Sequence, residues 1–78
     1  MAYDFRTELE KRLGKLSDDE YCKVKKMAID DLVKNEQYRL IEVETALTPD
    51  ATAPNLGAIR DALYRSFAMA LKLHRRLK

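Results

Sequence analysis

The chain has 78 residues, of which 46% are hydrophobic and 36% are charged, and it contains only two glycines and two prolines. This composition is typical of one small helical domain, and it excludes a multi-domain enzyme, a disordered chain and a glycine-rich β-fold. Cys22 is the single cysteine, which excludes an internal disulfide framework. A lone cysteine fits a reducing compartment, so we expect a cytoplasmic protein.

The net charge is only +2, but it is unevenly distributed along the chain. Residues 48–78 contain six lysines and arginines and only two acidic residues, Asp50 and Asp61, which gives this part a charge of +4. A basic segment of this kind can meet an acidic protein surface or a phosphate backbone. Basic residues in a last helical turn also complement the helix dipole, which is a purely structural explanation.

The first predicted helix covers residues 4–13. Phe5, Leu9, Leu13 and Leu16 recur at intervals of three or four residues, which places them on one side of a helix. Gly14 is well placed to end this helix, because glycine readily adopts the left-handed conformation that closes a helix.

The second predicted helix begins at residue 18. Ser17 and Glu20 have the spacing of a capping box, in which the serine hydroxyl accepts a hydrogen bond from the Glu20 amide. Leu16 and Tyr21 flank this pair with the spacing of a hydrophobic staple. The apolar periodicity that follows predicts one helix over residues 18–47.

The apolar stripe of this second helix is interrupted between Val33 and Leu40, where the inward positions fall on polar residues. Three interpretations are open. Glu36 and Arg39 form an ion pair at a wet edge, or they belong to a polar layer that sets the register between packed helices. In the third interpretation the helix breaks near Asn35.

The linker and the last helix complete the predicted fold. Residues 48–54 include both prolines and no bulky apolar residue, so they predict a loop that reverses the chain. A long amphipathic pattern then predicts a helix over residues 55–77. The predicted fold class is therefore all-α, a short helix followed by a long antiparallel helical hairpin in a single domain of residues 1–78.

The last helix has more apolar surface than one partner helix can cover. Its apolar arc spans roughly 200°, against about 100° for a helix that faces one neighbour. The small residues Ala62, Ser66 and Ala70 follow one another at intervals of four, which allows another helix to approach closely. We therefore expect self-association into a helical bundle, most simply a homodimer, through these three residues. The alternative is an apolar face that binds a different protein.

No residue pattern indicates catalysis. The chain lacks the glycine-rich phosphate loops, the HExxH zinc motif and the GxSxG nucleophile motif. His74 lies on the apolar side of the last helix, and neither it nor Cys22 has metal ligands at a suitable spacing. We therefore predict no enzymatic activity, no catalytic residues, no cofactor and no metal site.

The predicted function is that of a non-enzymatic protein-interaction module, such as a small adaptor or inhibitor encoded by a phage or mobile element. Its predicted partners are a second copy of itself and another protein, with no membrane. The predicted partner-binding residues are Arg65, Lys72 and Arg76 on the outward side of the last helix, together with Met69 and Leu73 on the margin beside them. The alternative is a nucleic-acid-binding regulator that uses the basic C-terminal helix.

Overall fold

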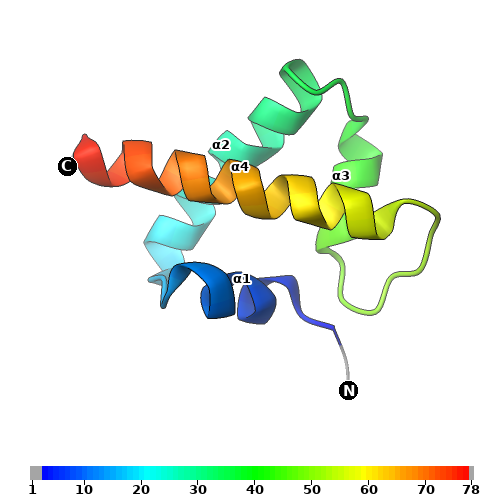
Figure 1. Cartoon of the computed structure of the whole chain (residues 1–78), viewed down its shortest axis with the longest axis horizontal. Coiled ribbons are helices and arrows are strands. Elements are labelled where there is room, and N and C mark those ends of the chain that lie inside the picture. The colour runs from blue at the N-terminus through cyan, green and yellow to red at the C-terminus, as the bar shows by residue number, and fades with distance from the viewer. Residues whose placement is uncertain (1–2, 78) are drawn as a thin grey trace.

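The computed structural model describes residues 3–77, and within this range the regular secondary structure is all helix without a β-strand, which confirms the all-α part of the predicted fold class (Figure 1). The four helices are α1 (Phe5–Leu13), α2 (Asp18–Lys34), α3 (Leu40–Leu47) and α4 (Leu56–Arg76). The longest of them, α4, crosses α2 steeply in Figure 1, with α1 on one side of it and α3 near its N-terminal end.

The starts of the first two helices follow from their capping side chains. Asp4 precedes α1, and its carboxylate accepts a hydrogen bond from the Thr7 amide at 3.2 Å. Ser17 precedes α2, and its hydroxyl accepts from the Glu20 amide at 3.1 Å, so the predicted cap is confirmed. Gly14 ends α1 with a φ of +89°, a backbone conformation that side chains disfavour.

The prediction of one helix over residues 18–47 is wrong. The chain leaves the helical conformation after α2 and resumes it at α3, so the structure has four helices where the sequence predicts three. Of the three interpretations of the interrupted stripe, the break is the one that the structure shows. The first arm of the predicted hairpin is therefore two helices and not one.

The break has a local cause. No aliphatic side chain between Val33 and Leu40 is available to hold a continuous helix against the core. Gln37 adopts a left-handed conformation with a φ of +60°, and the Tyr38 amide then donates to the Leu32 carbonyl at 3.0 Å. This turn brings the half-buried Tyr38 side chain against the hydrophobic core.

One hydrophobic core joins all four helices. Its fifteen buried hydrophobic members within residues 3–77 are Phe5, Leu9, Leu16, Val24, Ala28, Leu32, Val43, Ala46, Leu56, Ile59, Ala62, Leu63, Phe67, Ala70 and Leu71. Aromatic rings attach α1 to α4, since Phe5 stacks on Tyr64 at 5.2 Å between ring centroids and meets Phe67 at 5.4 Å. Part of the wide apolar arc of α4 is therefore covered by α1 within the same chain.

Tyr3 attaches the segment before α1 to distant parts of the chain. Its hydroxyl lies 2.7 Å from the Tyr64 hydroxyl, and its amide donates to Asp50 at 2.9 Å. The Arg60 guanidinium lies over the Tyr3 ring, 3.8 Å from the centroid, in a cation–π contact. Burial, followed by the hydrogen bond with Tyr64, raises the pKa of the Tyr3 hydroxyl above its ordinary value, so the hydroxyl is neutral at physiological pH.

Candidate binding surface

The outer side of α4 carries the five residues that the sequence predicts for partner binding. Met69 is 66% exposed and Leu73 is 51% exposed. Three cations, Arg65, Lys72 and Arg76, are exposed beside them. Four of these five side chains are spaced by four, four and three residues, so they form one row along the helix: Arg65, Met69, Leu73 and Arg76. This row is termed the α4 stripe.

The apolar part of the α4 stripe borders a groove between α2 and α4, termed the α2/α4 groove. The groove has a volume of about 240 Å³. It is lined by Met27, Asp31, Ser66, Met69, Ala70 and Leu73. Methionine is unbranched and flexible, so a groove with two methionines can adapt to ligands of different shape. Sequence periodicity placed Met69 and Leu73 on this side of the helix, but it did not indicate which residues of α2 face them.

Asp31 gives the groove one charged point. Its two carboxylate oxygens accept hydrogen bonds from the Asn35 side-chain amide at 2.7 Å and from the Ser66 hydroxyl at 2.8 Å. These hydrogen bonds, first that of Asn35 and then that of Ser66, lower the pKa of Asp31. The carboxylate is therefore negative at neutral pH, and it is held in place by donors from both helices.

The small residues predicted for self-association do not lie on the surface. Ala62, Ser66 and Ala70 are only 1%, 7% and 5% exposed. Ser66 contacts α2 directly through its hydrogen bond to Asp31, so these small side chains allow α4 to pack closely within its own chain. The prediction that they form a contact with a second copy is therefore corrected, because the contact that they make is internal.

The three cations on α4 are available to a ligand. Arg65, Lys72 and Arg76 make no ion pair with any side chain in the described part of the chain. Arg75 differs from them, because it donates to both carboxylate oxygens of Glu20 at 3.1 and 3.3 Å. This pair connects the end of α4 to the start of α2, and it leaves the other three cations facing solvent.

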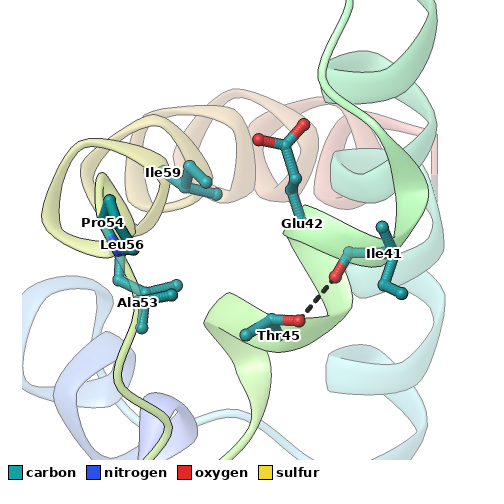
Figure 2. Close-up of a pocket in the computed structure, with 7 residues that line it drawn as sticks. All are labelled: Ile41, Glu42, Thr45, Ala53, Pro54, Leu56 and Ile59. Atoms are coloured by element: carbon teal, nitrogen blue, oxygen red, sulfur yellow. Dashed lines mark hydrogen bonds between the residues drawn. The ribbon is translucent and has the colours of Figure 1, made fainter.

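A second apolar cleft lies between α3, α4 and the loop that joins them (Figure 2). It has a volume of about 190 Å³ and is lined by Ile41, Glu42, Thr45, Ala53, Pro54, Leu56 and Ile59. The polar side chains of its wall already have partners. Thr45 donates to the Ile41 carbonyl at 2.7 Å, and Glu42 accepts from the Arg39 amide at 3.0 Å. The remaining lining is apolar, and sequence analysis missed this cleft because it forms only after the break and the loop bring three segments together.

The outer side of α3 is apolar and acidic. Leu40 and Ile41 are 51% and 69% exposed, and Glu44 is exposed beside them. The eight residues of α3 include two glutamates and no lysine or arginine. These three exposed residues together with the cleft of Figure 2 are termed the α3 face. It has the opposite charge to the α4 stripe.

The side chains of the types that most often react or bind metals are scattered over the described part of the chain. Cys22 is exposed, and His74 is half-buried with its Nε2 atom lacking a hydrogen-bond partner among the described residues. In residues 3–77 no three His, Cys, Asp or Glu side chains gather where they could hold a metal ion. None of the helices in that range combines the length and the hydropathy that crossing a membrane requires.

Comparison with protein-family models, with curated proteins and with solved structures gives no significant match. The fold and the surface therefore describe the protein as a chain of four helices with a largely apolar groove beside unpaired cations. The candidate binding site comprises the α2/α4 groove and the α4 stripe.

Proposed function

We propose that this chain is a non-enzymatic protein-interaction module that binds protein ligands in the α2/α4 groove. The observation that supports this function is the exposure of Met69 and Leu73 side by side along an open groove. Contiguous exposed apolar side chains around a groove are typical of a surface that another molecule covers. The unpaired cations of the α4 stripe add a rim that attracts acidic ligands.

The apolar pair supplies most of the expected affinity. Complete burial of a methionine or leucine side chain stabilises by roughly 1.5–3 kcal/mol. Because Met69 and Leu73 are already partly covered, the part still exposed corresponds to about 2–3 kcal/mol for the two together. Rim charges such as Arg65 and Arg76 mainly accelerate association and select acidic partners.

The predicted self-association is proposed for the same surface. The row of small residues is buried inside the chain, so the exposed side of α4 takes its place in the proposal as the surface for a second copy. A second copy and a different protein are thus two protein ligands for one groove, and both are part of the proposed function.

Site-specific crosslinking tests this function. Leu73 is replaced by the photoreactive residue p-benzoylphenylalanine, and the purified protein is irradiated in a lysate of the cells that encode it. We expect protein adducts from position 73 and few from a matched variant at Lys15, which is exposed in the turn between α1 and α2. Equal labelling from both positions would contradict the proposal. Adducts that nuclease removes would instead support a nucleic-acid-binding regulator.

A further inference from the structure

Two surfaces of this chain are complementary to each other. The α2/α4 groove is largely apolar, with the hydrogen-bonded Asp31 carboxylate in its wall and the unpaired cations of α4 beyond Met69 and Leu73, whereas the α3 face is apolar and acidic. We propose that the α3 face of one copy binds in the α2/α4 groove of a second copy, in a head-to-tail arrangement. This inference rests on the proposed function, because it uses the same groove, and it identifies a second copy of this chain as one of the ligands.

Charge decides between head-to-tail and symmetric pairing. From Arg65 to Leu77 the chain has four lysines and arginines and no acidic residue. Two grooves that faced each other symmetrically would bring these positive segments together, and like charges across an interface are unfavourable. The α3 face instead brings Glu44 towards one of the cations Arg65 and Arg76, neither of which has an ion-pair partner in its own chain within residues 3–77. Asp31, the acidic residue of the groove, keeps its hydrogen bonds from Asn35 and Ser66. Head-to-tail pairing is therefore the arrangement that the charges favour.

The positions of the exposed apolar side chains also favour head-to-tail pairing. The large hydrophobic residues that remain exposed in the described range are Leu40, Ile41, Met69, Leu73 and Leu77. The first two belong to the α3 face and the next two to the α2/α4 groove, so one contact would cover four of the five. The inserted element would be a helix whose backbone hydrogen bonds are already satisfied, which is the helix-in-groove mode of recognition.

A head-to-tail contact has a defined geometric consequence. Each pair of copies keeps one free groove and one free α3 face, so further copies can add until a ring closes or a filament grows. The two surfaces are small, and interfaces below about 1,200 Å² are weak and transient. We therefore expect assembly at high protein concentration, where a second copy would compete with another protein for the groove.

Two aspartate variants test this arrangement. Ile41→Asp disables the α3 face and Met69→Asp disables the groove, and both positions are at least 66% exposed, so the core is left intact. In sedimentation equilibrium under reducing conditions at about 100 µM, in the weak-interface regime, we expect the wild-type mass to exceed 9.1 kDa and to rise with concentration. Each variant alone should stay at 9.1 kDa. Cys22→Asp places the same charge at an exposed site outside both surfaces and should assemble like the wild type.

The mixture of the two variants is the decisive measurement. The Ile41→Asp chain retains its groove and the Met69→Asp chain retains its α3 face, so an equimolar mixture should form a pair with twice the mass of 9.1 kDa and stop there. A wild type that stays monomeric, or a mixture that fails to pair, would overturn the inference. If position 73 still crosslinks to a different protein in that case, the proposed function stands and only the second-copy ligand is refuted. If that crosslink is absent as well, both proposals fail.

Discussion

Replacing Gln37 with glycine should stabilise the protein. Gln37 has a φ of +60°, and a left-handed conformation costs a non-glycine residue about 1–2 kcal/mol. Glycine removes that cost, but it adds roughly 0.4–1 kcal/mol of backbone entropy to the unfolded chain. The Gln37 side chain is exposed, so its loss removes no core packing. The expected net gain is about 0.5–1 kcal/mol, which in a domain of this length raises the Tm by roughly 2–8 °C.

The sign of this change tests the break itself. In a continuous helix over residues 18–47, glycine at position 37 would lie in the helix interior and would cost about 0.5–1 kcal/mol. Urea unfolding followed by circular dichroism, with an unchanged slope, measures the difference. Glu36→Gly is the matched control, because Glu36 is exposed and has no positive φ, so glycine there should destabilise. If Gln37→Gly lowers stability as much as Glu36→Gly does, the left-handed turn does not form.

Three further outcomes are expected. Ser17→Ala removes the acceptor of a helix-end amide and should lower the free energy of unfolding by about 1 kcal/mol, and an unchanged urea midpoint would show that Ser17 is not the cap. Leu63→Ala empties a fully buried site and should lower the free energy of unfolding by about 2–5 kcal/mol. Leu73→Ala changes a half-exposed site and should lower it by less than about 0.5 kcal/mol. Equal losses of stability in the two variants would refute the surface position of Leu73. Ser66→Ala removes one hydrogen bond from Asp31 and should raise its pKa in a carboxyl NMR titration. Because the native pKa of Asp31 is lowered, its ionised carboxylate stabilises the fold above the unfolded pKa of about 4, and this stabilisation is lost as the pH falls through the native pKa. Identical acid unfolding of Ser66→Ala and wild type would contradict a contribution of the Ser66 hydrogen bond to stability.

Local signals in the sequence were sufficient for the starts of α1 and α2 and for the exposed position of the α4 stripe. The cap at Ser17 and the stop at Gly14 depend only on residues within one turn, and the structure has both. The break between α2 and α3 was visible only as a gap in the apolar stripe, for which three interpretations competed. Gln37 carried no signal, because glutamine, unlike glycine or asparagine, has no marked preference for the left-handed conformation.

The features that the sequence did not predict depend on contacts between segments that are distant along the chain. The periodicity of α4 showed that Ala62, Ser66 and Ala70 share one side, but it could not tell whether the helix that approaches them belongs to the same chain. The hydrogen bond from Ser66 to Asp31 shows that it does. The cleft beside Ile41 could not be predicted either, because its walls come from three segments whose relative positions depend on the break and on the loop after α3.

The aromatic attachment of α1 also bears on the order in which a nascent chain folds. Phe5 stacks on Tyr64, and Tyr3 hydrogen-bonds to the same tyrosine across a separation of 61 residues. During translation α1 is therefore complete long before these partners on α4 exist, and its Phe5 ring stays uncovered until the last helix is synthesised. The contacts of α1 with α2, such as that of Arg6 with Asp18, can form before the aromatic contacts with α4. A ribosome that pauses before α4 would leave the apolar side of α1, with Phe5 and Leu9, exposed, where the chaperones that meet nascent chains could bind it.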